Sequence, residues 1–435
     1  MSQENKAMSA VFLTVLFGFA GFSLPYPVFG PMFLKPELGF LDPSVPEQYR
    51  TILLGVAMAL YPIGQFVGAP WLGRMSDKVG RKPVLLASLL GAASGYIVVA
   101  VGVSTANLPM VLIGRFVSGL CEGNMAIAQS IASDISTPKS KVRNFGLLTV
   151  AINVGWIIGP LMGGFFSDPT IHPAFNVSWP FFFAAGMYGF NLLVVAVVLR
   201  IPEYARRRGR MPEDGPQTDR TVWQTLTDPS LMPAFVVSFF SYFAIFLFFC
   251  FFGVYLVQNH DVTSSFLGMC SAIISIPLIL AGLTVDRAQR PIGLRGVATI
   301  GHMLLGIGLL TFVLPDGLVW IFVPMCIAAF GIAWCEVTTS LFISNGAGAH
   351  EQGQALGIYR SVHVLAEAAA VLAGGVLAGL HTNAPFMVGC VAAFICVAGI
   401  LGWVKTRSVI PPRDAAQDVA SDVASDAAPE TAPAS

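Results

Sequence analysis

Charged side chains are scarce in this sequence: Asp, Glu, Lys and Arg make up 11% of its 435 residues, whereas 55% are hydrophobic. An ordinary soluble domain carries roughly 25% charged residues. A water-soluble fold cannot cover so much apolar surface with so few charges, so lipid must be part of the solvent. The net charge is zero, which implies no general attraction for nucleic acid.

Motifs for covalent, metal or nucleotide chemistry are also missing. The seven cysteines form no CxxC pair and have no His pair nearby, which argues against a zinc site or a disulfide framework. There is no catalytic triad and no Walker-type GxxxxGK[ST] segment, so ATP is not the direct energy source. We therefore expect no enzymatic activity, no metal and no cofactor. The short polar N-terminus does not read as a cleavable signal.

What the sequence does contain is a series of long apolar runs. A bilayer core of about 30 Å takes about 20 helical residues. The runs are continuous and do not alternate with polar residues, which favours helices over a barrel. We expect twelve spans, near residues 9–34, 51–72, 84–104, 108–132, 146–167, 179–200, 231–257, 264–285, 296–314, 318–343, 354–380 and 385–404.

The Lys and Arg residues predict how these spans are oriented. With the N-terminus in the cytoplasm, 20 of the 24 fall in cytoplasmic segments, Lys35 and Arg50 lie outside, and Arg115 and Arg360 lie within spans. This asymmetry fits the positive-inside rule and an even number of spans. It predicts a multi-pass protein of the inner membrane with both termini in the cytoplasm.

Three short patterns recur at similar offsets, which suggests two related halves. Gly73-x-x-x-Asp77 returns as Gly282-x-x-x-Asp286, Cys121-Glu122 as Cys335-Glu336, and Gly163-Gly164 as Gly374-Gly375. Paired six-helix halves are a transporter architecture with the solute site between them. The expected fold is an all-α membrane protein of two pseudo-symmetric six-helix bundles, with bundles at 1–200 and 231–407, a cytoplasmic linker at 201–230 and a disordered tail at 408–435.

The segment after the second span has the composition of a gating loop. Its glycines allow a tight turn and close helix approach, and Asp77 can pair with Arg81 or with a neighbouring helix end. Such a charged latch can hold one closed state and release in another; an ordinary basic loop is the alternative. The predicted gating residues are Gly73, Asp77, Gly80, Arg81, Lys82 and Asp286.

Ionisable residues inside the spans are the main candidates for proton coupling. A charge at membrane depth is costly and usually faces a cavity or a partner. Arg115 and Glu122 are seven residues apart, which puts both on one face of a continuous helix, and the same spacing relates Arg360 to Glu367. Structural ion pairs are the alternative reading. The proton-coupling candidates are Arg115, Glu122, Glu336, Glu367 and His363.

Polar residues in the spans are candidates for the wall of a solute cavity, although hydrogen bonds between helices explain them equally well. The cavity candidates are Gln65, Asn124, Gln129, Asn153 and Arg360. The aromatic run at 239–252 reads mainly as bulk facing lipid. In the fifth span, glycines every fourth residue allow close helix packing and a proline invites a bend. That motif comprises Gly155, Gly159, Pro160, Gly163 and Gly164.

These segments resemble the major facilitator superfamily, specifically its twelve-helix drug:proton antiporters close to the tetracycline-efflux proteins. GRMSDKVGRKPVLLASLLGAASGY is similar to that family's loop 2–3 signature running into helix 3. IGRFVSGL resembles its helix-4 arginine motif, which implies a proton-coupling role for Arg115. VGWIIGPLMGG resembles the helix-5 antiporter motif, which is associated with exporters. The good match covers roughly residues 60–165.

The sequence departs from that family where tetracycline pumps carry acids in helices 1 and 3. Those positions fall at Gly18 and Gly95 here, which puts tetracycline itself in doubt, while Glu122 stands where the family usually has a small residue. We infer that charge handling has moved to Glu122, Glu336 and Glu367.

The resemblance implies a secondary active transporter that exports a small drug-like compound or metabolite by proton-coupled alternating access. Its expected partners are the bilayer, protons and the solute, and we expect a monomer. Two alternatives stay open: a proton-coupled importer of the same fold, and a membrane receptor or scaffold that transports nothing.

Overall fold

The fold is that of a twelve-helix membrane protein. The computed structural model describes all residues except 1–2, 138–139, 201–220, 316, 348–350 and 403–435. Within this described part, twelve helical segments are long and apolar enough to cross a membrane. The all-α prediction is therefore confirmed. Most of the predicted linker and the whole predicted tail lie outside the described residues.

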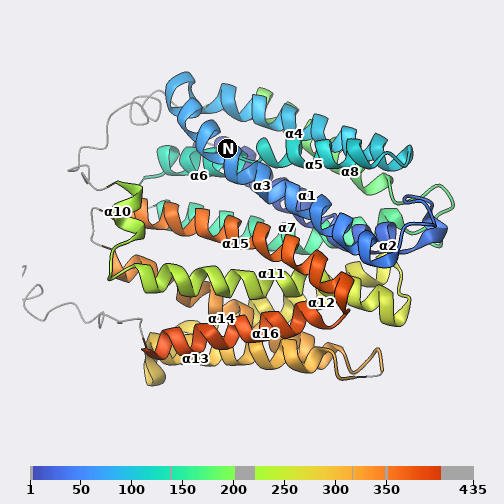
Figure 1. Ribbon diagram of the computed structural model, residues 1–435. Coiled ribbons are helices and arrows are strands. Elements are labelled where there is room, and N and C mark those ends of the chain that lie inside the picture. The colour runs from blue at the N-terminus through green and yellow to red at the C-terminus, as the bar shows by residue number, and fades with distance from the viewer. Residues whose placement is uncertain (1–2, 138–139, 201–220, 316, 348–350, 403–435) are drawn as a thin grey trace, which may run out of the picture.

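The first half forms one layer of the molecule, the upper one in Figure 1. Short breaks divide its first and fourth spans into two helices each. The helices are α1 (Gln3–Ser23), α2 (Tyr26–Leu34), α3 (Glu47–Val79), α4 (Arg81–Ser104), α5 (Leu108–Leu120), α6 (Asn124–Ile135), α7 (Lys141–Ser167) and α8 (Trp179–Val198), with the 3-10 turn Pro36–Leu38 between α2 and α3.

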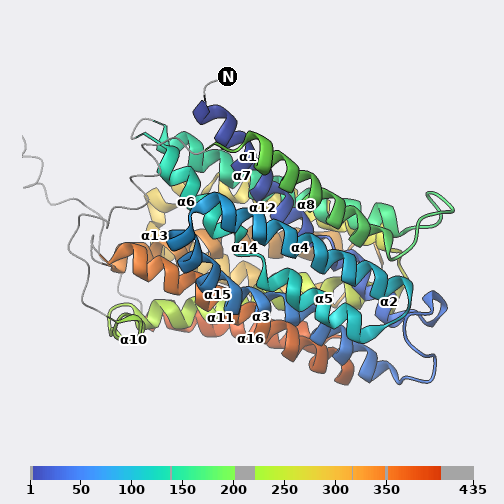
Figure 2. The same cartoon turned by 90° about the horizontal axis from the view of Figure 1, so that it is seen from above.

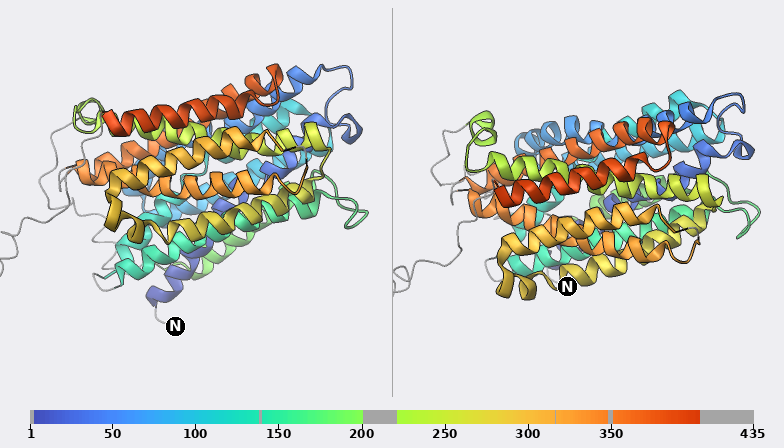
Figure 3. Two further views of the ribbon diagram at one scale, coloured as in Figure 1. Left: turned by 90° about the horizontal axis from the view of Figure 1, so that it is seen from below. Right: turned by 60° about the horizontal axis from the view of Figure 1, so that its bottom comes forward.

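The second half forms the other layer, and its yellow, orange and red helices lie in front when the molecule is seen from below (Figure 3). A short helix, α10 (Val222–Leu226), precedes it. Its spans are α11 (Met232–His260), α12 (Ser264–Gly282), α13 (Val285–Phe312), α14 (Phe322–Gly346), α15 (Gln352–Leu380) and α16 (Ala384–Gly402). Figures 1 and 2 both show α3 of the first half running beside α15 of the second.

Three local predictions need correction. The predicted gating loop is mostly helical, because α3 continues to Val79 and α4 starts at Arg81; only Gly80, with φ of 111°, separates them. The fourth span is not one continuous helix, because α5 ends at Leu120 and α6 starts at Asn124. Glu122 therefore lies in a turn, and its seven-residue spacing from Arg115 does not put both on one helical face.

The aromatic run in α11 does not face lipid as predicted. None of its nine aromatic residues is exposed, and Tyr242, Phe246, Phe248, Phe251 and Phe252 are buried. The reason is the position of α11, which packs against α2 of the first half and against α14, α15 and α16 of its own half. A helix surrounded in this way buries its bulky side chains whatever their period in the sequence.

Candidate functional site

The two halves meet tightly at one end of the molecule, which we call the closed end. There α3 and α15 touch through glycines: a Cβ placed on Gly55 would lie 2.9 Å from the Cα of Gly375. On the other side of the interface, a Cβ on Gly164 of α7 would lie 2.5 Å from the carbonyl oxygen of Ser264 in α12. Larger residues at these positions would separate the helices.

The fifth-span motif occupies both sides of α7. Gly155 and Gly159 lie directly against α1, and Gly163 lies against Leu24 and Pro27, where α1 passes into α2. Pro160 and Gly164 face α12 of the second half, where a Cβ on Gly268 would lie 2.6 Å from the Pro160 carbonyl oxygen. Helix α7 therefore packs against the first half on one side and against the second half on the other.

Polar side chains add links between the halves at the closed end. Lys35 pairs with Asp261, the Gln258 amide donates to Glu47 over 2.8 Å, and the Ser265 hydroxyl donates to Asp168 over 2.6 Å. Burial alone would raise the pKa of Asp168, but hydrogen bonds from Ser265 and Thr170 outweigh burial and hold that pKa below its ordinary value. The contact between Asp168 and Ser265 therefore stabilises the closed end fully at any pH above the ordinary pKa of an aspartate. That stabilisation is lost only as the pH falls through the lowered pKa of Asp168.

The interface opens toward the other end, which carries Arg74, Lys78, Arg81 and Lys82 and which we call the basic end. On the face of α15 that meets α3, the residues nearer the closed end are buried: Glu367, Val371, Gly374, Gly375 and Ala378. Nearer the basic end, Gly353, Gly357 and Arg360 are exposed. On α7 a Cβ at Gly146, and on α12 a Cβ at Gly282, would meet no atom of the described residues within 4 Å. The interface is therefore less tightly packed toward the basic end than at the closed end.

The predicted gating residues surround the break between α3 and α4. Arg81 binds Asp77 over 2.5 Å and Asp134 of α6 over 3.4 Å, and Lys82 donates to the Leu199 carbonyl over 2.8 Å. These contacts stay within the first half. A Cβ on Gly73 would meet no atom within 4 Å in the described part of the chain, and Asp286 is exposed in the first turn of α13. The role of these residues as a gate stays a prediction.

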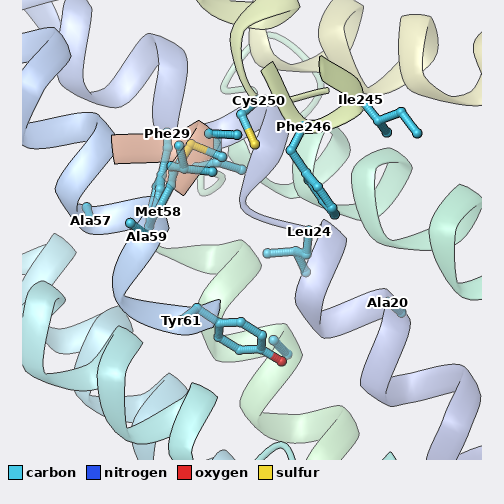
Figure 4. Packing of buried hydrophobic residues seen from close by; sticks show 14 of the residues in the cluster. Ala20, Leu24, Phe29, Ala57, Met58, Ala59, Tyr61, Ile245, Phe246 and Cys250 are labelled. Atoms are coloured by element: carbon cyan, nitrogen blue, oxygen red, sulfur yellow. The ribbon is translucent and has the colours of Figure 1, made fainter. Parts of the chain in front are cut away.

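A small buried cavity lies where the halves meet, near the middle of α15. Its volume is about 10 Å³, roughly the space of one water molecule. Arg115 of the first half and Glu367 of the second line it, and both are 3% exposed. The other lining residues are Phe22, Pro25, Tyr26, Met58, Cys250 and Val371. Figure 4 shows Cys250 and Phe246 of α11 meeting Phe29, Met58 and Leu24 of the first half.

Arg115 is held by aromatic rings rather than by an acid. Its guanidinium carbon lies 4.6 Å from the centre of the Tyr61 ring and 5.5 Å from that of Phe29, which is cation–π geometry. Its Nε donates to the Ala57 carbonyl over 3.4 Å, but among the described residues Nη1 has no hydrogen bond of good geometry. Among the described residues, no acid lies within 4 Å of Arg115 and no cation within 4 Å of Glu367. The Glu367 carboxylate is thus available to a proton, and both charges are available to a water or a solute.

Glu122 lies elsewhere, enclosed within the first half. The Tyr188 hydroxyl donates to its Oε2 over 2.9 Å, and a Cβ on Gly18 of α1 would lie 2.9 Å from its Oε1. The carboxylate therefore occupies the space that a side chain at position 18 would fill. Tyr61 and Asn124 adjoin it, but the Tyr61 hydroxyl and both Asn124 amide atoms lack hydrogen bonds of good geometry.

This arrangement predicts that Gly18→Ala will displace Glu122. The new methyl group would meet Oε1, and a strained or lost hydrogen bond to a charged group costs about 1.5–3 kcal/mol. We expect a lower thermal unfolding midpoint for the purified protein, and no such loss for Gly186→Ala, whose Cβ would meet nothing within 4 Å. In a Glu122→Ala background the Gly18→Ala effect should largely disappear. An unchanged effect there would show that the carboxylate is not the obstacle.

The second half carries a separate polar cluster on α11, α14 and α15. Arg360 Nη1 donates to His363 Nδ1 over 3.0 Å. The His363 ring stacks on Tyr242 with 3.7 Å between ring centres, and the Tyr242 and Tyr359 hydroxyls are 2.8 Å apart. Glu336 is partly exposed on α14 nearby. The structure thus places Glu336, Arg360 and His363 in one cluster. Arg115 and Glu367 line a shared cavity, and Glu122 belongs to neither group.

The predicted polar cavity residues are divided as well. Gln65 on α3 and Asn153 on α7 are partly exposed, and Gln129 on α6 is exposed. Asn124 is 1% exposed and adjoins Glu122 instead. Sequence reasoning missed the tyrosines that contact these candidate residues: Tyr61, Tyr188, Tyr242 and Tyr359. The one feature of the sequence that could have indicated them is a hydroxyl inside an apolar span, because a buried hydroxyl usually needs a hydrogen-bond partner.

Comparison with known proteins identifies the family. The Major Facilitator Superfamily model matches residues 11–371. The chain is 28% identical to the class H tetracycline resistance protein of Pasteurella multocida over 366 residues, 81% of this chain and 84% of that one. It is 34% identical to the class C protein of Escherichia coli over 206 residues, 47% of this chain and 48% of that one.

A solved structure shows the same architecture. The chain matches the crystal structure of a D-xylose–proton symporter with a TM-score of 0.70 and 16% identity, covering 93% of this chain and 98% of that one. At such low identity the likeness establishes the fold alone. Because the family model covers most of the sequence, the chain belongs to the major facilitator superfamily of membrane transporters.

Proposed function

We propose that the protein exports a small drug-like compound or metabolite in exchange for protons, by alternating access. The observation that supports this most directly is the cavity shared by Arg115 and Glu367, one charge from each half, with no ion pair for either among the described residues. Its relatives are named for tetracycline resistance, which favours export over import. Tetracycline itself is not assumed, because Gly18 and Gly95 stand where the resemblance places acids.

Glu367 is the proposed site of proton coupling at the interface. A buried carboxylate that forms no ion pair is costly to keep charged, so protonation of Glu367 lowers the cost of closing the halves over it. A proton taken from outside would favour the conformation seen here, and its release at the open basic end would allow solute to bind and the halves to reopen outward. Glu122 is proposed as a second acid that takes up and releases a proton, within the first half.

The basic end is proposed to face the cytoplasm, since Lys and Arg concentrate there. This places the opening on the side from which an exporter takes its solute. We further propose an inner-membrane location, cytoplasmic termini and a monomeric transporter that carries out no covalent chemistry.

Transport in oriented vesicles tests this function. Everted vesicles from cells that produce the protein should acidify inside on energisation and then accumulate a labelled substrate, and a protonophore should abolish accumulation. Right-side-out vesicles should not accumulate it. Accumulation only in right-side-out vesicles would identify an importer, and gradient-independent binding without transport would identify a receptor.

A further inference from the structure

Arg360 stands at the point where the α15 interface face becomes exposed toward the basic end. An arginine side chain is always a hydrogen-bond donor, so His363 Nδ1 must accept the bond from Arg360 Nη1. The imidazole is therefore neutral and carries its proton on Nε2. This bond orients the guanidinium and leaves its positive charge uncompensated.

Glu336 supplies the opposite charge on the neighbouring helix α14. It is partly exposed and close enough to Arg360 for electrostatic attraction. Even so, no cation lies within 4 Å of its carboxylate among the described residues. The Thr339 and Tyr359 hydroxyls bind its backbone carbonyl instead. Two opposite charges thus lie on neighbouring helices without forming an ion pair among the described residues.

A flat aromatic surface adjoins this charge pair. His363 stacks on Tyr242 at an interplanar angle of 12°, and Phe246 lies 5.4 Å from the imidazole centre. The hydrogen bond between the Tyr242 and Tyr359 hydroxyls fixes the tyrosine ring. Because Tyr242 is buried and His363 is partly exposed, the imidazole presents the accessible part of the stack. Such surfaces favour planar aromatic groups.

We propose that Arg360, Glu336 and the His363–Tyr242 stack form a solute site that selects planar aromatic zwitterions. The anionic group of the solute binds Arg360, its protonated amine binds Glu336, and its ring lies on the stack. A monocation or a monoanion leaves one protein charge unpaired, which disfavours it. This inference rests on the proposed export function and assigns Glu336 to the solute rather than to the proton.

Equilibrium binding to the purified full chain in lipid nanodiscs tests this site. The probes are a fluoroquinolone with a free carboxylate and a free amine, its methyl ester, and its N-acetyl derivative. We expect the parent compound to bind about tenfold more tightly than either derivative, the equivalent of about 1.4 kcal/mol. Arg360→Gln should abolish the preference over the ester, and Glu336→Gln the preference over the N-acetyl compound. Ser361→Ala, an exposed neighbour on another face, should bind as the unchanged protein does.

Arg360→Lys keeps the charge and should retain the preference over the ester even if Arg360→Gln fails to fold. The proposal is overturned if Arg360→Gln or Glu336→Gln keeps the full preference, or if the planar cation ethidium binds as tightly as the zwitterion. Binding is measured without a gradient, so such a failure leaves proton-driven export untouched. Conversely, intact selectivity with no vesicle transport would contradict the export function alone.

Discussion

Glu367→Gln is expected to lose about 100-fold of proton-driven transport, near the upper range of coupling between two sites, while still binding solute. Glutamine keeps the shape of the side chain but cannot take up or release a proton. The cavity it shares with Arg115 would then have the same charge in every state, and a pH gradient would no longer favour one conformation over the other. Uptake into everted vesicles, with and without an imposed pH gradient, measures this loss.

Two comparisons make that result specific. Glu37→Gln, on the exposed turn between α2 and α3, should transport normally. Glu122→Gln separates the two proposed proton sites, because its carboxylate is enclosed in the first half and does not line the interface cavity. If Glu367→Gln keeps its response to the gradient while Glu122→Gln loses it, the coupling proton is carried by the first half and our assignment is wrong.

Gly375→Leu is expected to prevent the conformation described here and to reduce transport at least tenfold. A Cβ at this position would already lie 2.9 Å from the Cα of Gly55 and 2.9 Å from the Thr51 carbonyl oxygen. The remaining leucine atoms could enter only if α3 and α15 separated. Overpacking of this kind costs about 1–3 kcal/mol, enough to shift a two-state population about five- to 150-fold toward the conformation open at the present closed end.

Spin labels at positions 146 and 282 can measure this shift. Both glycines lie at the basic end, one in each half, with no atom near the position of a Cβ. In a background without the native cysteines, Gly375→Leu should shorten the distance between the labels, because the basic end closes when the other end opens. Gly186→Leu on α8, where nothing lies within 4 Å, should leave the distance unchanged. An unaltered distance in Gly375→Leu would mean that the glycine contact does not control the conformation.

The spans could be predicted from sequence because bilayer thickness sets the length of an apolar run. The breaks within the spans could not be predicted from sequence, because packing between helices determines where they form. The turn at Glu122 forms where α5 packs directly on α3: Gly119 lies against the Tyr61 carbonyl and Gly68 against that of Leu120. Ser88 of α4 then donates to the Cys121 carbonyl, which the turn frees from the helix.

The candidate site was partly predictable for a similar reason. Charges are rare in the spans, so Arg115, Glu122, Glu336, Glu367 and Arg360 could be listed from sequence alone. Their grouping could not, since it depends on which helices adjoin. The recurring Cys-Glu pair illustrates this: Glu122 lies in a turn against Gly18, whereas Glu336 lies within the unbroken helix α14. Equivalent sequence positions therefore have different environments and, in our proposals, different roles.

The glycine contacts at the closed end have a further consequence for the energy balance of the cell. A plug built from main-chain atoms does not depend on side-chain rotamers, so it has few ways to admit a file of water molecules. Hydronium ions would otherwise leak through the resting protein and dissipate the membrane's stored energy with no solute moved. We therefore expect the close approach of Gly55 to Gly375, and of Gly164 to Ser264, to limit proton leakage when no solute is being moved.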